Sequence, residues 1–572
     1  MTAVALAQAL WLLLAAIGLA LSVSYAGLPV LGQGAFVAAG GVGTAVLGPG
    51  GAGLPLGLAV VIAVLTAAGL GGLVAYGASR LEGAYFGLAT WALAWLVFRG
   101  LQAFPGFSGG EQGLTRTTPA QLVSPALGTT WVLTPLTHVV VAGLLCALAL
   151  GLLVRLDRGP GGSDLAALRT GPDLARSLGV PVAARRRTVL LVTAALGGLS
   201  GAGSTVLLGL VAPSDVSPLL SLQLFVAVLI GGTARWWGPV LGVAALSALP
   251  SVADALAATA GIAPERARGV LTAALLVAAL ALRAPLARAL TRLPGRPLGP
   301  NATGPLVPSQ PGPGRTHRAT RLQAEGLRVA YGAVLALDGV DLDLRAGQVH
   351  ALIGPNGSGK STLLRVLAGD LVPEAGEVRV DGRPVAPTNA DRVRAGVART
   401  PQTTVTLARQ PPGRQTAVGA RAGAPAGSVL RGLLATPASR VEADRRSAVV
   451  TRALQSCGLA AVADVDPARL AVGEQRLLQI ARVVATGAGV LLLDEPAAGM
   501  TAQERTRLVE VLRGLARSGY AVLLVEHDVR LVTAVADTVT VLDAGRVLAS
   551  GPPAEVRADP AVRRAYLGDL SG

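Results

Sequence analysis

Hydrophobic residues are spread unevenly along the chain, in long runs over the first half and in short runs over the second. Runs of the length that crosses a bilayer lie near residues 4–24, 55–79, 84–102, 137–154, 188–210, 218–234, 238–255 and 267–285, with a shorter glycine-rich run near 33–48. We therefore expect eight or nine spans, because the short run either crosses the membrane or re-enters it. The first run lacks a basic flank and other runs follow it, so it is predicted to be a retained span and not a signal peptide.

The second half has the pattern of a water-soluble domain. From Thr320 onward, β-branched runs alternate with helical stretches rich in Ala, Leu and Arg, which predicts an α/β domain with a substantially parallel sheet. The stretch between Leu293 and Gly314 is rich in Pro and Gly and reads as a linker. The predicted organisation is an all-α polytopic membrane domain over 1–290, a linker over 291–319 and an α/β domain over 320–572. No element is predicted within 403–445.

Charge sets the orientation of this arrangement. The net charge is +16, but the arginines concentrate in segments 155–187 and 283–321, which flank hydrophobic runs. The preference for basic residues on the cytoplasmic side explains them without a nucleic-acid partner. We expect a multi-pass protein of the cell (inner) membrane, in contact with lipid, with the α/β domain in the cytoplasm and loop 103–136 outside. The two cysteines, one in each half, make neither a disulfide framework nor a metal site.

A glycine-rich loop near the start of the α/β domain predicts phosphate binding. The pattern G-x-x-x-x-G-K-S runs from Gly354 to Ser361, after an apolar strand and before a helical pattern. Backbone N–H groups of such a loop converge on phosphate oxygens, a lysine supplies a point charge and a serine hydroxyl binds Mg²⁺. Lys360 is the only lysine of the chain. The predicted nucleotide-binding residues here are Gly354, Asn356, Gly357, Ser358, Gly359, Lys360, Ser361 and Thr362, with ATP and Mg²⁺ as cofactors.

Two later apolar strands end in residues suited to hydrolysis. The segment VLLLDEP ends in Asp494 and Glu495, which we assign to the metal and to the attacking water, respectively. The segment AVLLVEHD places His527 at the end of another strand, where it contacts the γ-phosphate or orients Glu495 and the water. These residues predict an ATPase and not merely a nucleotide-binding domain.

The order of these motifs resembles the ATP-binding cassette family, whose cassettes have a P-loop NTPase fold. The resemblance covers 320–572 and implies that Tyr331 stacks on adenine and that Gln402 acts in catalysis and at the metal. The segments GVARTPQ and EPAAGM and the tail SGPPAEVRADPAVRRAYLGD are similar to ATPase subunits of branched-chain amino-acid transporters. In the membrane half, LSVSYAGLPVLGQGAF, RLEGAYFGLATWAL, LARSLGVPV and LIGGTARWWGPVLG resemble the permease of the same class.

The resemblance implies a fused permease and ATPase that drives uptake of branched-chain amino acids or related small polar solutes. It also implies partners: a second permease, a second cassette and an extracytoplasmic solute-binding protein. The 163–187 loop is then the coupling segment seated on a cassette.

The segment that corresponds to the family signature departs from its L-S-G-G-Q/E pattern. It reads Leu470, Ala471, Val472, Gly473 and Glu474, so it lacks a hydroxyl and carries a branched side chain where glycine allows close approach to the partner's nucleotide. One interpretation is an asymmetric pair of cassettes in a hetero-oligomer, with one working and one poor site; another is that the changes are tolerated. A third is a regulatory or degenerate subunit that binds nucleotide, hydrolyses it weakly and supports a partner cassette.

Overall fold

The computed structural model describes residues 2–77, 81, 83–115, 121–124, 129–158, 165–169, 171–232, 236–260, 263, 270, 274, 319–401, 410–420 and 437–567. The chain divides into two compact units, one of residues 1–158 and 183–297, the other of residues 159–182 and 298–572. The predicted linker over 291–319 lies outside the described residues except for Ala319.

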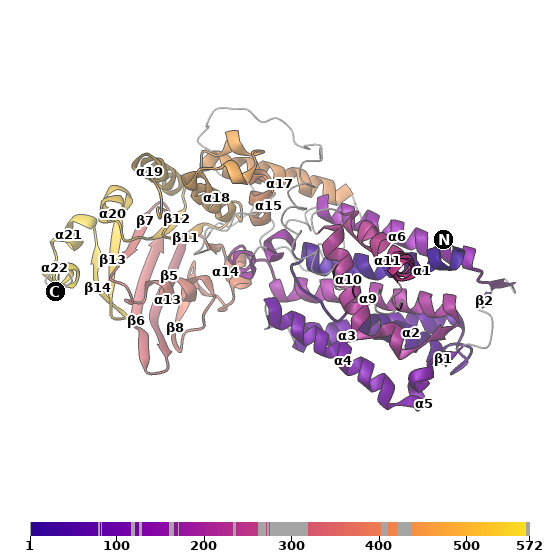
Figure 1. Cartoon of the computed structure of the whole chain (residues 1–572). Coiled ribbons are helices and arrows are strands. Elements are labelled where there is room, and N and C mark those ends of the chain that lie inside the picture. The colour runs from indigo at the N-terminus through magenta and orange to yellow at the C-terminus, as the bar shows by residue number, and fades with distance from the viewer. Residues whose placement is uncertain are drawn as a thin grey trace. The chain divides into compact units, whose positions relative to one another are not determined.

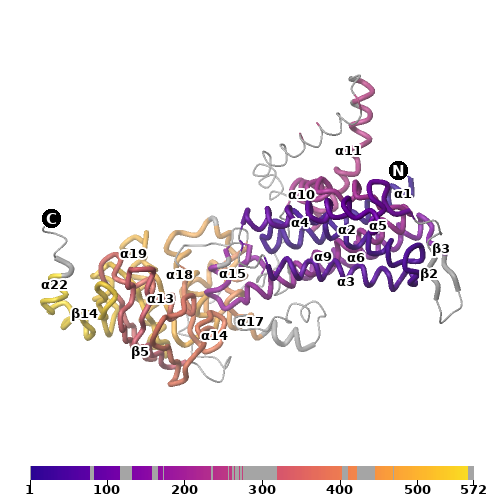
Figure 2. The backbone as a smooth tube through the Cα atoms, turned by 90° about the horizontal axis from the view of Figure 1, so that it is seen from below, coloured from indigo at the N-terminus to yellow at the C-terminus, as the bar shows by residue number. Residues whose placement is uncertain are grey.

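The first unit is a bundle of long apolar helices that run side by side (Figures 1 and 2), except α11 (Gly238–Ala260), which points away from the others in Figure 2. Within the described residues, seven helices are long and apolar enough to span a membrane. In the order of the chain they are α1 (Ala3–Ala20) continued by a π-helical turn (Leu21–Tyr25), α3 (Leu56–Gly77), α4 (Gly83–Ala103), α6 (Pro135–Arg158), α9 (Val182–Leu208), α10 (Pro218–Gly231) and α11 (Gly238–Ala260). The predicted polytopic helical domain is confirmed in class, although it also contains the short antiparallel strand pairs β1 (Leu114–Thr115) with β4 (Leu210–Val211) and β2 (Gln121–Ser124) with β3 (Thr129–Val132). Its 267–285 run lies almost entirely outside the described residues.

The short glycine-rich run forms helix α2 (Gln33–Leu47), which is almost completely buried in the bundle. Close approach of helices requires glycine here, because a Cβ on Gly40 would meet the carbonyl oxygen of Gly198 at 1.9 Å. The buried amide of Gln33 donates hydrogen bonds to the carbonyls of Ala15 (3.1 Å) and Thr193 (3.4 Å). The helix α2 thus joins α1 and α9 through backbone contact and one shared amide.

One spanning helix extends beyond the hydrophobic run that predicted it. The hydrophobic run begins near 188, whereas α9 begins at Val182 and includes the three arginines Arg185, Arg186 and Arg187. Arginine is a good helix former, and its long stem can lie along an apolar surface while the guanidinium reaches polar partners. Helix length therefore exceeds the length of the hydrophobic run.

The second unit contains the predicted α/β domain, which is confirmed. A six-stranded sheet has the order β10-β11-β12-β7-β13-β14, and all neighbours are parallel except β13 and β14. The strands are β7 (Val349–Ile353), β10 (Val397–Arg399), β11 (Val490–Asp494), β12 (Ala521–Val525), β13 (Thr538–Asp543) and β14 (Arg546–Gly551). The central strands β7, β11 and β12 are buried at every position, as expected for a parallel sheet covered on both faces.

A second sheet is antiparallel, with the order β6-β5-β8-β9. It comprises β5 (Arg321–Tyr331), β6 (Val334–Arg345), β8 (Ala375–Val380) and β9 (Arg383–Pro384). The helices of this unit are α8 (Pro172–Ser177), α13 (Lys360–Ala368), α14 (Asn389–Ala395), α15 (Pro412–Gly419), α17 (Pro437–Ser456), α18 (Val472–Val484), α19 (Ala502–Arg517), α20 (Val529–Val535), α21 (Pro553–Ala558) and α22 (Pro560–Leu567). In Figure 1, α21 and α22 lie beside β14 at the C-terminal edge. The described part of 403–445 contributes α15 and the start of α17.

The segment between α6 and α9 groups with the second unit. Its short helix α8 contacts α14. Gly179, just after α8, has φ = +70°, and a Cβ there would meet the side chain of Val393 on α14 at 2.7 Å. Leu174 and Leu178 are buried. A glycine at 179 therefore allows this segment to sit directly on α14.

Candidate active site

The glycine-rich loop connects the buried strand β7 to the start of α13. Gly354 and Gly359 have positive φ angles, and a Cβ on either would lie 2.2–2.4 Å from a carbonyl oxygen, of Leu542 and Ala336 respectively. Only glycine fits these two positions, so the loop backbone packs tightly against the neighbouring segments. Its shape, a strand followed by a glycine loop and a helix N-terminus, is that of a phosphate cradle.

The only lysine of the chain extends over this loop. Lys360 Nζ donates hydrogen bonds to the carbonyls of Gly354 and Pro355, both at 2.7 Å. Partial burial lowers the pKa of Lys360, and the nearby charges of Glu495 and Asp494 oppose that shift. The charges of the two predicted carboxylates thus act directly on the lysine of the loop.

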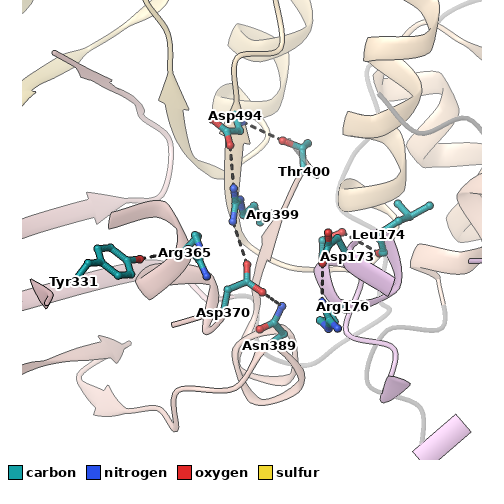
Figure 3. A network of polar contacts seen from close by, with 11 residues as sticks. Asp173, Leu174, Arg176, Tyr331, Arg365, Asp370, Asn389, Arg399, Thr400 and Asp494 are labelled. Carbon is teal, nitrogen blue, oxygen red and sulfur yellow. Dashed lines mark hydrogen bonds and ion pairs between the residues drawn. The ribbon is translucent and has the colours of Figure 1, made fainter. Parts of the chain in front are cut away.

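The other predicted nucleotide-binding residues surround this lysine. Asn356 and Gly357 are exposed at the top of the loop, Ser358 is buried beneath it, and Ser361 and Thr362 lie in the first turn of α13. Tyr331 lies at the end of β5 with 47% of its surface exposed. Its hydroxyl accepts a hydrogen bond from Arg365 of α13 at 3.3 Å (Figure 3), so an exposed ring is held beside the helix that follows the loop.

Asp494 ends β11 with its side chain buried. Arg399, the last residue of the adjacent strand β10, donates to Asp494 Oδ2 at 2.9 Å and to Asp370 Oδ2 at 3.0 Å (Figure 3). The backbone N–H of Asp494 donates to Thr400 Oγ1 at 3.0 Å. The sequence analysis missed Arg399, although the segment GVARTPQ contains it, because its carboxylate partner lies 95 residues away.

Glu495 follows in an unusual backbone conformation. Its φ of +41° lies in the left-handed region, which residues other than glycine seldom adopt outside constrained sites. The backbone N–H donates to the carbonyl of Val525 at 3.0 Å, which fixes this turn on β12. The carboxylate is half exposed, and His527 Nδ1 lies 3.9 Å from Glu495 Oε1. The structure therefore brings the predicted base and the predicted histidine together.

A further carboxyl group, Glu526, lies beneath them. Its side chain is buried, and Oε1 accepts a hydrogen bond from the N–H of Ala497 at 2.9 Å. Burial raises the pKa of Glu526, while that hydrogen bond and the charge of His527 oppose the rise. Glu526 holds the turn after Glu495 and was not predicted as a site residue.

The signature segment forms the N-terminus of α18. Leu470 is buried, Ala471 occupies the N-cap position and Val472 is 50% exposed at the first helical position. The N–H of Ala471 donates to Glu474 Oε2 at 3.0 Å. The N–H of Gly473 donates to Glu504 Oε1 at 2.9 Å. Two hydrogen bonds from Thr501 and, after them, the one from Gly473 lower the pKa of Glu504. Glu504 was missed, although the Thr501-x-x-Glu504 pattern marks it as a capping residue.

The predicted metal site combines oxygen ligands from the glycine-rich loop, from the end of β11 and from Gln402. Gln402, predicted as a ligand and a catalytic residue, lies outside the described residues. Within the described part of the chain, no group of three or more His, Cys, Asp or Glu residues could hold a metal ion. Mg²⁺ fits the two other predicted ligands, Ser361 and Asp494, because it usually takes one or two protein oxygens and completes its shell with phosphate oxygens and water.

Comparison with protein families matches both halves of the chain. Residues 1–280 match the family described as the permease component of the branched-chain amino acid transport system, and residues 337–498 match the family described as ABC transporter. Residues 546–569 match a third family, described as branched-chain amino acid ATP-binding cassette transporter. The tail singled out in the sequence analysis, from Ser550 to Asp569, lies within that last match.

Similar curated proteins cover the cassette half. The ATP-binding protein BraF of high-affinity branched-chain amino acid transport in Pseudomonas aeruginosa is 35% identical over 250 residues, 43% of this chain and 98% of BraF. Its counterpart LivG of Salmonella typhimurium is 37% identical over 253 residues, with the same shares. The hemin import ATP-binding protein HmuV of Streptomyces coelicolor is 38% identical over 270 residues, 46% of this chain and 89% of HmuV.

A crystal structure of a nucleotide-free ATP-binding cassette from an ABC transporter is 27% identical, and the match covers 43% of this chain and 98% of that cassette with a TM-score of 0.38.

Proposed function

The chain belongs to the ABC transporters, as a fusion of a branched-chain amino-acid-type permease with an ATP-hydrolysing cassette, and we propose that it drives uptake of branched-chain amino acids or related small polar solutes. The observation that carries the proposal is that the permease half and the C-terminal segment 546–569 each match the same transporter class independently. Neither match results from ATP binding alone, because both segments lie outside the nucleotide-binding motifs.

The cassette residues divide the work of hydrolysis. Lys360 and the loop N–H groups bind the β- and γ-phosphates, with Tyr331 stacking on adenine. Glu495 accepts the proton of the attacking water, and His527 holds that carboxylate and the water in line. The left-handed backbone at Glu495 and the buried Glu526 beneath it keep the base in position before the nucleotide arrives.

Mg²⁺ is assigned to the hydroxyl of Ser361 and the carboxylate of Asp494, with Gln402 as a third participant. When held there by these residues, the ion would supply positive charge that neutralises the nucleotide's phosphates. Asp494 is fixed for this role by Arg399 and by the hydrogen bond from its own N–H to Thr400.

Transport requires more than this chain. We assign the cassette and the 155–187 segment to the cytoplasm of a cell (inner) membrane protein, with α8 as the coupling segment seated on α14. The complete importer adds a second permease, a second cassette and an extracytoplasmic binding protein. The proposed domain boundaries are 1–290, 291–319 and 320–572.

A second candidate function rests on the signature helix. Val472 and the Glu504 carboxylate occupy the end of α18 that, by the family pattern, approaches the partner's γ-phosphate. This arrangement favours a hetero-oligomer in which this chain's signature completes a weak ATP site on the partner cassette. If the weakening extends to both sites, the chain is a subunit that binds nucleotide but hydrolyses it poorly.

The proposed function is tested by uptake. The complex, co-expressed with its candidate partners, is reconstituted in proteoliposomes so that radiolabelled leucine or urea is offered on the binding-protein side and ATP on the other. ATP-dependent leucine uptake that Glu495→Gln abolishes supports the proposal. Uptake of urea alone overturns the amino-acid assignment, and bound ATP with no uptake of any solute favours the second candidate function.

A further inference from the structure

A chain of polar contacts leads away from the nucleotide site. It begins at Asp494 and passes through Arg399 to Asp370. The second oxygen of Asp370 accepts a hydrogen bond from Asn389 Nδ2 at 2.6 Å, and Asn389 is the first residue of α14 (Figure 3). Four side chains thus connect the end of β11 to the N-terminus of a helix that is not part of the nucleotide site.

The geometry of Arg399 suits a link and not a simple counter-ion. Its side chain is 9% exposed, and separate guanidinium nitrogens, Nη2 and Nη1, donate to Asp494 and Asp370 respectively. A planar guanidinium fixes the direction of both hydrogen bonds, whereas an ammonium is a point charge that cannot hold two carboxylates in a defined plane. One side chain therefore holds the carboxylates of Asp370 and Asp494 in a defined arrangement.

The far end of the chain meets the segment that follows α6. The helix α14 is held from the inside by Arg392, which is fully buried and donates to the carbonyl of Val378 at 3.2 Å. On another side, Val393 lies against Gly179, directly after α8. In Figure 3, Arg176 of α8 lies on the side of α8 that faces Asn389, and α8 contacts α14. The α8 segment therefore packs against the same short helix that Asn389 begins.

We propose that Arg399 is a positioning residue that ties Asp494 of the nucleotide site to α14, and through α14 to the α8 segment. The inference rests on the proposed function, in which α8 is the coupling segment and Asp494 serves the metal. The proposed connection between Asp494 and the α8 segment runs through Arg399 and not through Gln402.

The test is a double-mutant cycle on nucleotide binding by the full chain in nanodiscs. Glu495→Gln is present throughout to prevent turnover. The measured quantity is the metal-dependent gain, defined as the ATP affinity with Mn²⁺ divided by the ATP affinity in EDTA. Asn389→Ala removes the far link, Arg399→Met removes the bridge with little change in volume, and Arg394→Ala is the control, because its ion pair with Asp391 lies on α14 outside the chain of contacts.

Asn389→Ala is expected to change the metal-dependent gain two- to threefold or more in the Arg399 background, and by much less in the Arg399→Met background, as coupled residues behave in such cycles. Arg394→Ala leaves the metal-dependent gain unchanged. In Arg399→Lys, the metal-dependent gain stays as in Arg399→Met, and Asn389→Ala again has little effect on it. The electron paramagnetic resonance spectrum of bound Mn²⁺ changes with Asn389→Ala only when Arg399 is present.

Equal effects of Asn389→Ala in both backgrounds overturn the proposal, as does rescue by lysine, because either result makes Arg399 an ordinary counter-ion. Gly179→Ala, which presses a methyl group on Val393, serves as a second perturbation from the α8 side and obeys the same dependence on Arg399. If the chain binds no ATP under any condition, the proposed function fails; if it binds ATP with no coupling, only the role of Arg399 fails.

Discussion

The carboxylate of Glu504 accepts a hydrogen bond from the backbone N–H of Gly473 at 2.9 Å, so the N-terminus of the signature helix already carries an anion. Helix N-termini attract negative charge, and a resident carboxylate competes with a phosphate for the same N–H group. This contact lies in the segment that departs from the family's signature pattern. It adds to the interpretation in which Ala471 and Val472 weaken one site of an asymmetric pair.

Replacing this carboxylate is predicted to raise turnover. Glu504→Gln keeps the capping contact with Thr501, since glutamine is also accepted at that position, but removes the charge facing Gly473. We expect the ATPase rate of the full chain in nanodiscs to rise about three- to tenfold, the size of one modest charge effect at a helix end. Glu510→Gln, an exposed change on the same helix α19, is the matched control. An unchanged rate in Glu504→Gln would show that the carboxylate does not limit closure.

Restoring the family hydroxyl is predicted to affect both stability and activity. Ala471 occupies the N-cap of α18, with φ = −61° and ψ = 158°, a conformation in which serine accepts a hydrogen bond from the first turn. Ala471→Ser should stabilise the cassette by about 1 kcal/mol. It should also increase ATPase activity, whereas Ala471→Gly, which is favoured over alanine at an N-cap but has no hydroxyl, should stabilise the cassette without increasing activity. Higher stability without higher activity would mean that the hydroxyl acts only as a cap.

Aromatic stacking by Tyr331 predicts a difference between two substitutions. The ring is exposed beside α13, and its hydroxyl only accepts a hydrogen bond from Arg365. Tyr331→Ala should weaken ATP binding about tenfold, because stacking of a base on an aromatic side chain is worth about 1–3 kcal/mol. Tyr331→Phe should change the affinity less than twofold by the same argument. Binding of ATP and GTP to the purified chain measures both effects, and equal losses in the two variants would place the contact at the hydroxyl.

The buried Glu526 predicts a specific dependence of stability on pH. Burial raises its pKa in the folded state above the ordinary value of 4.5. The folded state thus binds this proton more readily than the unfolded state, so the ionised carboxylate lowers stability above the folded pKa, and this loss is relieved as pH falls toward 4.5. Glu526→Gln should raise the melting midpoint of the cassette by about 2 °C at pH 8 and leave it unchanged near pH 4.5.

The melting midpoint can be followed through a thiol. Cys457 is fully buried in the cassette, and burial raises its pKa to about 12, so it reacts with 4,4′-dithiodipyridine, a disulfide reagent that also titrates thiols in weak acid, only after unfolding. Cys146→Ala removes the other free cysteine and restricts the signal to the cassette. A higher midpoint at both pH values would trace the effect to packing and not to charge.

Local motifs were predicted from the sequence, and contacts between distant segments were not. The phosphate loop, Asp494 and the pair of Glu495 and His527 follow from strand ends and glycine spacing, since each is set by a few adjacent residues. Arg399 and Glu504 were missed because their importance comes from partners 95 and 31 residues away in sequence. The helix α9 begins before its hydrophobic run for a related reason: hydrophobicity marks where a helix meets lipid, not where the helix begins.

The central claim is that this chain is the motor of an importer, and its most direct test is ATP hydrolysis by the complex in nanodiscs with its co-expressed partners. Binding protein loaded with each of a panel of amino acids is added to the wild type and to Glu495→Gln. The account predicts turnover that rises with one class of loaded solute and disappears in Glu495→Gln, while ATP affinity is retained. ATP bound with no turnover in any combination of partners and solutes would contradict it.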